Sequence, residues 1–370
     1  MPFMVPPDVS ATVHGHVTDA VRAPSLIRLS ENMVLVRFET LKIYAALGAV
    51  RALLADGTVR PGDTVIDSSS GIYALALAMV CHRYDLRCHI VASTTVTPTI
   101  RSQLEILGAT VDQMPAESDL RLDQDRRVAR IRQLLRANPG MHWMRQYHDP
   151  IHYLGYAELA GLVHIALPDR PLTVVASVGT GASSAGLIQP LRRHDPSARL
   201  VGVQPFGSVS FGSERFQDPE AIIAGIGSAI PFDNVRPDLY DQLHWLTFHY
   251  AMAGAIDLMR AHAVFAGLST GAAFLVAAWE AQRHPGREHL VIGADTGHRY
   301  VDRVFTRHRD ALDRAALKPA EIGTLGDLAP PWSTMAWDQR THPEHPGPRL
   351  PASRPSPRTC PAPGLMTDGC

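Results

Sequence analysis

Between residues 40 and 305, short apolar runs alternate with longer segments of helical periodicity, and this alternation constrains the fold more than any other feature. Residues 64–67, 88–93 and 172–178 are typical of buried strands, and a helical pattern follows each of them. Strands that alternate with helices form right-handed βαβ units, which build parallel sheets covered on both faces. A chain of 370 residues has room for two such sheets. We therefore expect an α/β fold of two domains, each a mostly parallel sheet covered by helices.

The remaining elements are predicted from the same two periodicities. Further strands are expected near residues 110–111 and over 142–145, 199–204, 244–249 and 289–294. Helices are expected over residues 73–81, 98–107, 121–137, 153–166, 183–193, 252–262 and 272–281, and residues 299–305 close the region.

The character of the chain changes at Pro330. Residues 330–370 contain 10 of the 29 prolines, with Ser, Thr, Arg and Gly between them. Such a composition does not bury enough apolar surface to order a chain. We therefore predict a disordered Pro-rich tail over residues 330–370.

Charge and cysteine content exclude several classes of function. The formal net charge is -1, which predicts no long-range attraction to nucleic acid or to anionic lipid. No run of 18 apolar residues is present, so no membrane-spanning helix is expected, and residues 1–13 do not resemble a secretory signal. The four cysteines are too few for a disulfide scaffold, and His82 and His89 beside Cys81 and Cys88 match no zinc spacing. We expect a cytoplasmic protein without a metal site.

Lysine is almost absent from the basic residues. The chain has 33 Arg but only two Lys, Lys42 and Lys318. Arg cannot form a Schiff base or lose its proton, so amine chemistry would fall to one of these two lysines. Lys318 lies in a polar stretch, whereas Lys42 lies in the apolar segment 38–50. From this segment alone, Lys42 is either a helix-start lysine that extends to solvent or a desolvated, reactive amine.

Three small-residue turns stand at predicted helix starts, and the first two follow predicted strands, the place where parallel α/β folds bind ligands. They are residues 67–71 (Asp-Ser-Ser-Ser-Gly), 178–184 (Val-Gly-Thr-Gly-Ala-Ser-Ser) and 266–271 (Ala-Gly-Leu-Ser-Thr-Gly). The first suits a carboxylate and the second a phosphate, because backbone N–H groups and a helix dipole would face the anion. None matches the P-loop or the dinucleotide fingerprint. Together with Lys42, they are the groups that pyridoxal phosphate chemistry on an amino acid requires.

These motifs resemble those of the fold-type II pyridoxal-phosphate enzymes, specifically the cysteine synthase and cystathionine β-synthase group. The likeness covers about residues 25–305 and implies the tryptophan synthase β-subunit-like fold. It implies a smaller, mobile domain over residues 40–150 that binds the substrate carboxylate. Residues 14–39 and 151–325 would form the larger domain, which binds the cofactor phosphate.

The resemblance also implies roles for single residues. Lys42 would form the Schiff base, and Ser269 would face the pyridine nitrogen. The remaining implied positions are Gly179, Thr180, Gly181, Ala182 and Ser183 for the phosphate, and Ser69, Ser70, Gly71, Gln146 and Gly225 for the substrate. We expect burial to lower the pKa of Lys42, as its role as a base requires.

Two departures from the family's pattern point to a specialised biosynthetic enzyme. The family usually has Asn-Pro-x-Gly-Ser before the lysine, whereas Glu39-Thr40-Leu41 leads directly to Lys42. The family also has an asparagine, bonded to the cofactor's 3′-hydroxyl, where this chain has Ile72.

The implied activity is β-replacement on an O-activated serine, either O-acetyl- or O-phosphoserine, through an aminoacrylate, with a small nucleophile. The alternatives are β-elimination by a serine or threonine ammonia-lyase, or a cofactor-free homologue that acts as a binding protein. The resemblance also implies a homodimer.

Overall fold

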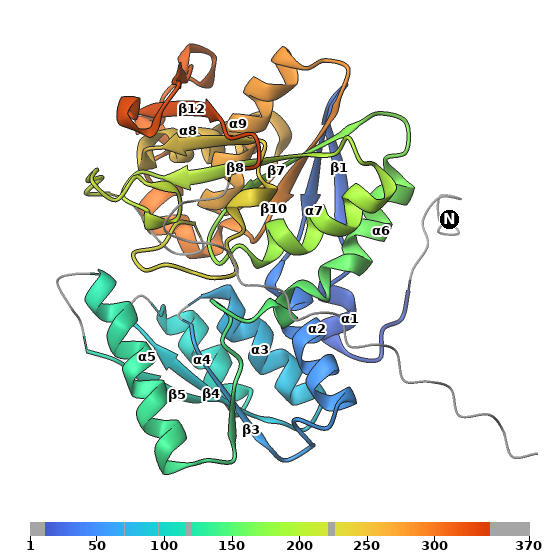
Figure 1. The fold of residues 1–370 in the computed structure, drawn as a ribbon, viewed down its shortest axis with the longest axis vertical. Coiled ribbons are helices and arrows are strands. Elements are labelled where there is room, and N and C mark those ends of the chain that lie inside the picture. Colours follow the sequence, from blue (N-terminus) through green and yellow to red (C-terminus); the bar gives the residue numbers. More distant parts are fainter. Residues whose placement is uncertain (1–11, 70, 95, 116–119, 221–225, 341–370) are drawn as a thin grey trace, which may run out of the picture.

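The computed structural model describes residues 12–69, 71–94, 96–115, 120–220 and 226–340. These residues form two sheets, one above the other in Figure 1, and helices cover both faces of each sheet. The two expected helix-covered sheets are therefore confirmed. Among the described residues, no helix is both long enough and apolar enough to cross a membrane.

The smaller sheet has the strand order β5-β4-β3-β6, and every pair is parallel. Its side chains alternate between two cores: Val65 on β3 packs toward the helices α2 and α3, while the adjacent Ile66 packs toward α5. Buried strands of this kind need cover on both faces, as expected from their apolar runs. The elements of this unit are α2 (Lys42–Ala55), β3 (Thr64–Ser68), α3 (Ile72–Arg83), β4 (Arg87–Ala92), α4 (Pro98–Ile106), β5 (Thr110–Gln113), α5 (Leu120–Ala137) and β6 (Met141–Trp143). We call it the small-sheet unit.

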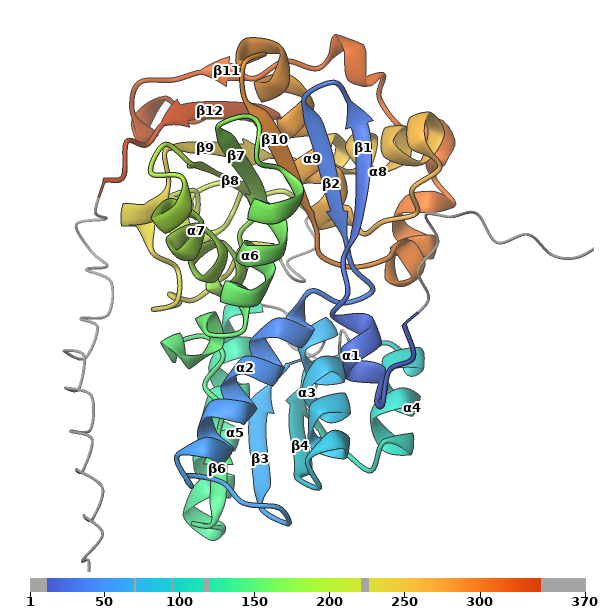
Figure 2. The same ribbon diagram turned by 90° about the vertical axis from the view of Figure 1, so that its right-hand side faces the viewer.

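The larger sheet has the order β1-β2-β10-β7-β8-β9-β12-β11. Its five central strands are parallel, and α6 and α7 cover one face while α8 and α9 cover the other (Figures 1 and 2). The elements of this large-sheet unit are β1 (Ser25–Ser30), β2 (Met33–Arg37), α6 (Tyr156–Ala166), β7 (Leu172–Ser177), α7 (Ala182–His194), β8 (Arg199–Pro205), β9 (Gln242–Leu246), α8 (Phe248–His262), α9 (Leu268–Arg283), β10 (Glu288–Gly293), β11 (Ala320–Glu321) and β12 (Trp332–Ala336).

Short elements connect the two units. The helix α1 (Val17–Val21) lies beside α3, where Asp19 pairs with Arg83 at 2.7 Å. A 3-10 turn, Pro150–Tyr153, precedes α6, so the helix expected over residues 153–166 starts a few residues later than predicted. The remaining single turns are Val209–Phe211, Pro237–Leu239, Gly297–Tyr300, Val301–Phe305, His308–Asp310, Arg314–Ala316 and Leu325–Asp327.

The start of the predicted tail at residue 330 is wrong. Residues Trp332–Ala336 form β12, which pairs antiparallel with β9 and is buried over its first four residues. The Pro-rich average over residues 330–370 concealed a short run of aromatic and β-branched residues, and such residues favour strands. The rest of the predicted tail, residues 341–370, lies outside the described residues.

The expected strand over residues 244–249 is also wrong at its end. β9 stops at Leu246, and Thr247 is the extended N-cap residue of α8. The N–H of Phe248 donates to Asp218 at 2.7 Å, so a distant carboxylate satisfies the first turn. His249 consequently lies in a helix, and the signal for this start comes from a residue 30 positions away.

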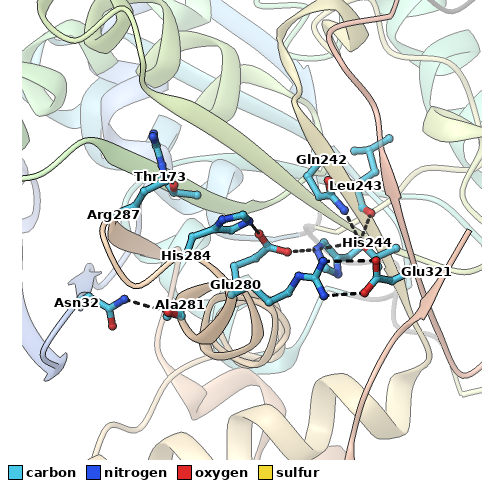
Figure 3. A network of polar contacts seen from close by, with 12 residues as sticks. Asn32, Thr173, Gln242, Leu243, His244, Glu280, Ala281, His284, Arg287 and Glu321 are labelled. Atoms are coloured by element: carbon cyan, nitrogen blue, oxygen red, sulfur yellow. Dashed lines mark hydrogen bonds and ion pairs between the residues drawn. The ribbon is translucent and has the colours of Figure 1, made fainter.

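A buried polar network holds β12 in place, and Figure 3 shows the part of it around His244 and Glu280. The Nδ1 atom of His244, on β9, accepts a hydrogen bond of 3.0 Å from the indole N–H of Trp332. The Nε2 atom of His244 lies 3.2 Å from Glu280 on α9, and His284 approaches the other oxygen of Glu280 at 3.6 Å. Because Nδ1 accepts, Nε2 carries the imidazole proton and donates it toward Glu280. The C-terminal strand is therefore tied to both a strand and a helix.

Candidate active site

Lys42 is the first residue of α2, and the apolar side of this helix is buried in the core. Its Nζ atom lies 3.0 Å from the hydroxyl of Thr180, in the turn after β7 of the other unit. Burial lowers the pKa of Lys42 to about 8, because the ammonium loses its hydration. The lowered pKa confirms the expectation from the sequence. Of the two interpretations left open, the structure favours the desolvated amine.

One pocket brings the predicted lysine together with groups of the large-sheet unit. Its walls come from the start of α2, the start of α3, the turns after β7 and β10, and the start of α9. The lining residues are Leu41, Lys42, Ile72, Ser177, Gly179, Ser183, Ser269, Ile292, Ala294, Asp295, Arg299 and Tyr300.

The turn after β7 leads into α7, a helix of 13 residues. Its N-cap residue, Gly181, has a left-handed backbone (φ +81°) and no side chain to cap the helix, and the N–H of Ala182 makes a long bond of 3.4 Å to the hydroxyl of Thr180. A Cβ at this position would lie 2.2 Å from the backbone oxygen of Asn234, so only glycine fits. Gly179 and Ser183 line the pocket, which places them beside the uncapped N-terminus. Such an N-terminus is suited to a phosphate.

Ser269 stands at the second position of α9 and lines the same pocket. Its carbonyl oxygen accepts a hydrogen bond of 2.7 Å from the hydroxyl of Ser177, at the end of β7. This bond joins the start of α9 to the carboxyl end of a central strand. Ser269 therefore stands on the pocket wall beside the carboxyl end of β7.

The expected carboxylate turn follows β3. The hydroxyl of Ser69 accepts from the N–H of Ala74 at 3.1 Å and from that of Gly71 at 3.4 Å, so it stabilises the start of α3. Gly71 is the N-cap residue of α3. Ser70 lies outside the described residues.

Gln146 stabilises the chain just before this turn. Its side-chain amide donates to the carbonyl of Ser68 at 2.6 Å, and its backbone N–H donates to Asp67 at 3.0 Å. Gln146 therefore holds the end of β3 in place and does not line the pocket. Gly225 lies outside the described residues, but Gly227 donates a backbone hydrogen bond of 2.7 Å to Val178.

Three charged residues were not predicted from the sequence: Asp295 and Arg299, which line the pocket, and Arg127, which contacts the end of β3. Asp295 and Arg299 follow β10. Their position just after a predicted strand is a signal that the sequence contained, because ligand groups gather at the carboxyl ends of parallel strands. Arg127, on α5, is 5% exposed and donates to the hydroxyl of Ser68 at 2.8 Å. Nothing in the sequence distinguishes Arg127 from the other arginines of that polar helix.

The groups around the pocket fit pyridoxal phosphate. An amine with a lowered pKa can bond an aldehyde carbon, the uncapped start of α7 can accept a phosphate, and a serine hydroxyl can bond a ring nitrogen. Across the described residues, no group of three or more His, Cys, Asp or Glu side chains could hold a metal ion.

Curated proteins similar to this chain include three bacterial relatives. N-(2-amino-2-carboxyethyl)-L-glutamate synthase of Ralstonia nicotianae is 33% identical over 255 residues, which are 68% of this chain and 74% of the relative. The protein of the same name from Cupriavidus metallidurans is 33% identical over 291 residues, 75% of this chain and 83% of the relative. A putative cysteine synthase of Sinorhizobium fredii is 30% identical and covers 77% of this chain and 85% of its own.

Solved structures of the same fold include O-ureido-L-serine synthase, with a TM-score of 0.71 and 22% identity over 82% of this chain and 99% of the other. An O-acetylserine dependent cystathionine β-synthase from Helicobacter pylori also has a TM-score of 0.71, with 22% identity over 79% and 99% of the two chains. The family described as pyridoxal-phosphate dependent enzyme matches residues 18–294. The chain therefore belongs to the pyridoxal-phosphate dependent enzyme family, as the resemblance predicted.

Proposed function

We propose that the chain catalyses β-replacement on an O-activated L-serine, with the amine of L-glutamate as the incoming nucleophile. The observation that carries the proposal is the half-buried Lys42 in a pocket that is also lined by Ser183 at the start of α7 and by Ser269. When bound, pyridoxal phosphate supplies the electron sink for the pair released at the substrate α-carbon.

Each residue around the pocket has its own role in the proposed reaction. Lys42 holds the cofactor and then takes the α-proton of the substrate at Nζ, and a pKa near 8 leaves part of the amine neutral at physiological pH. Gly179, Thr180, Gly181, Ala182 and Ser183 hold the phosphate, and Ser269 bonds the ring nitrogen. The turn 69–71, supported by Gln146, receives the substrate carboxylate at the start of α3.

The bonds balance without a further reactant. The C–O bond at the β-carbon breaks, and its electron pair leaves with the acetate or phosphate. A C–N bond forms from the glutamate nitrogen, which loses one proton, and the α-carbon regains the proton that Lys42 had removed.

The choice of glutamate rests on the two relatives at 33% identity. The product in the name of these relatives carries a 2-amino-2-carboxyethyl group on L-glutamate. This group is the three-carbon skeleton that serine provides once its β-oxygen has left. A thiol-dependent cysteine synthase is the second candidate, because the Sinorhizobium fredii relative is named as a putative one.

Product analysis of the holoenzyme tests the proposal. The enzyme is supplied with O-phospho-L-serine or O-acetyl-L-serine, together with L-glutamate, with sulfide, or with neither. Mass spectrometry should find the glutamate adduct, and Lys42→Arg enzyme should form none. Cysteine as the only product would favour the thiol-dependent reaction, and equal amounts of pyruvate in every arm would favour β-elimination. A chain that binds no cofactor would instead favour the binding protein.

We also propose that the chain forms a homodimer in the cytoplasm. Leu162 and Ile165 are exposed apolar side chains on α6, and Leu154 lies exposed just before this helix. Neighbouring apolar side chains of this kind support an interface with a second copy. Light scattering coupled to size-exclusion chromatography tests it, since a monomer mass would contradict the dimer.

A further inference from the structure

Arg299 is a second cation on the wall of the pocket, in addition to Lys42. Its side chain is 16% exposed, and its Nε atom is buried without a hydrogen-bond partner among the described residues. The nearest carboxylate, that of Asp295, lies 3.8 Å from Nη1, which is beyond hydrogen-bond distance. A half-buried guanidinium with so few acceptors has donors left for a ligand.

The guanidinium faces the start of α3. A Cβ built on Gly71 would lie 3.1 Å from Nη1 and 3.2 Å from Nη2 of Arg299. Ile72 follows Gly71 and lines the same pocket, but its side chain offers no hydrogen bond. Arg299 therefore supplies hydrogen-bond donors to a part of the pocket wall where the α3 side chain supplies none.

The covalent structure of pyridoxal phosphate orients its ring between the proposed anchors. The phosphate arm and the 3-oxygen flank the carbon that bonds the lysine, so they point to opposite sides of it. With the phosphate at the start of α7 and Lys42 at that carbon, the 3-oxygen would point away from α7. The lining residues outside α7 include Ile72, Asp295 and Arg299, and the guanidinium of Arg299 lies beside the start of α3. An ionised 3-oxygen needs a donor there, and of these three side chains the guanidinium is the one that always carries donors.

We propose that Arg299 donates a hydrogen bond to the 3-oxygen of bound pyridoxal phosphate and so replaces the asparagine that related enzymes have at the position of Ile72. The proposal rests on the proposed roles of Lys42 and of the turn before α7.

Asp295 acts as a positioning residue for this guanidinium. It is 4% exposed, and its carboxylate lies 3.8 Å from Nη1 of Arg299. Burial raises the pKa of Asp295 to about 6, so the carboxylate is ionised at higher pH and keeps the guanidinium in the pocket. The titratable side chains on the pocket wall are Lys42, Asp295, Arg299 and Tyr300.

Three variants of the holoenzyme test the proposal: Arg299→Met, Arg299→Lys and, as a matched control, Arg303→Met on the exposed side of the same segment. Two quantities are measured, the dissociation constant of pyridoxal phosphate and the pH midpoint of its visible absorption band. In Arg299→Met, cofactor affinity should fall roughly ten- to hundredfold, as for loss of a charged hydrogen bond. The pH midpoint should rise by about one unit, because a nearby cation favours the more anionic form. Arg303→Met should match the wild type.

If Arg299 only packed against Gly71, the variants would behave differently. Under our proposal, Arg299→Lys keeps the midpoint near its wild-type value, and Ile72→Asn added to Arg299→Met restores affinity. Unchanged affinity and midpoint in Arg299→Met, or a double variant as weak as Arg299→Met, would overturn it. If Arg299→Met does not fold, Arg299→Lys and Arg299→Gln are compared, and equal midpoints overturn the proposal. A cofactor label that maps away from Lys42 would instead refute the proposed function.

Discussion

The two sheet units contribute different groups to the same pocket. The small-sheet unit brings Lys42 at the start of α2 and the turn before α3, while the large-sheet unit brings the starts of α7 and α9 and the turn after β10. Neither unit contains the whole set, so the site exists only where the carboxyl ends of both sheets approach each other. Parallel sheets place their ligand groups at this edge, and two facing sheets enclose the ligand between them.

The units also differ in how their edges are closed. The small sheet is entirely parallel, and its edge strands β5 and β6 are only four and three residues long. The large sheet adds antiparallel partners at both sides, β1 against β2 and β12 against β9. Additional strands protect the central parallel strands that hold the cofactor turns. The large sheet is therefore completed by chain segments at the two ends of the described residues, β1 and β2 before Lys42 and β12 after the last pocket residue.

Loss of the Lys42 amine should have the largest effect, and this effect is on cofactor attachment and turnover. Lys42→Arg keeps the charge of the small-sheet unit but cannot bond the cofactor, and losing the base alone lowers turnover by on the order of 10²–10⁴-fold. Borohydride reduction followed by peptide mapping measures the attachment. Lys318→Arg is the control, since Lys318 is exposed and lies far from every pocket residue in sequence. A pyridoxyl label on Lys318 would refute the proposal that the small-sheet unit provides the amine that bonds the cofactor.

Trp332→Ala tests whether β12 supports the large-sheet unit. The indole is 2% exposed and bonded to His244, so its removal should lower the free energy of unfolding by about 3–5 kcal/mol. Urea denaturation measures this change. A chain that ends after Arg340 is the control and should be as stable as the full chain, because residues 341–370 are rich in proline. Equal stability of Trp332→Ala and wild type would show that β12 is dispensable.

Gly181→Ala should destabilise the large-sheet unit at the proposed phosphate turn. The new methyl group would meet the backbone of Asn234 in a left-handed conformation, at a cost of roughly 2–5 kcal/mol. Gly57→Ala, in the small-sheet unit, is the control. Gly57 has φ +75° but open space around it, so its cost should be only about 1–2 kcal/mol. Thermal unfolding of the cofactor-free proteins compares them, and equal losses would mean that the approach of Asn234 is unimportant.

Ser69→Ala should have the smallest effect, confined to the small-sheet unit. Loss of the bonds to the start of α3 should lower stability by about 1 kcal/mol and raise the KM of the amino-acid substrate. Thr97→Ala removes a comparable bond from the start of α4, which does not border the pocket. Steady-state kinetics should show a raised KM for Ser69→Ala alone. A raised KM in both variants would attribute the effect to general loosening of this unit.

Local patterns in the sequence predicted most of the parallel core. The apolar runs that became β3, β4, β7 and β10 are buried on both faces, and such strands are recognisable from composition alone. The strands β1, β2 and β12 were missed; β2 and β12 are stabilised by pairing with β10 and β9, which lie far away in the sequence, and among the described strands β1 pairs only with β2. The strand boundary at Thr247 failed for the same reason, since its helix start depends on Asp218.

By itself, the sequence determined the kinds of group in the site and their order along the chain. It specified one lysine in an apolar segment, three small-residue turns at helix starts, and Ile72 where the resemblance implies an asparagine. Only the tertiary structure decided which of these groups meet. In the folded chain, the amine of Lys42 bonds the hydroxyl of Thr180, and the side-chain amide of Gln146 bonds the end of β3. The guanidinium of Arg299 lies beside Gly71. The physical reason is that a turn or a charge is encoded locally, whereas a contact between two sheets depends on how their helices pack, and packing is shared among residues throughout the chain.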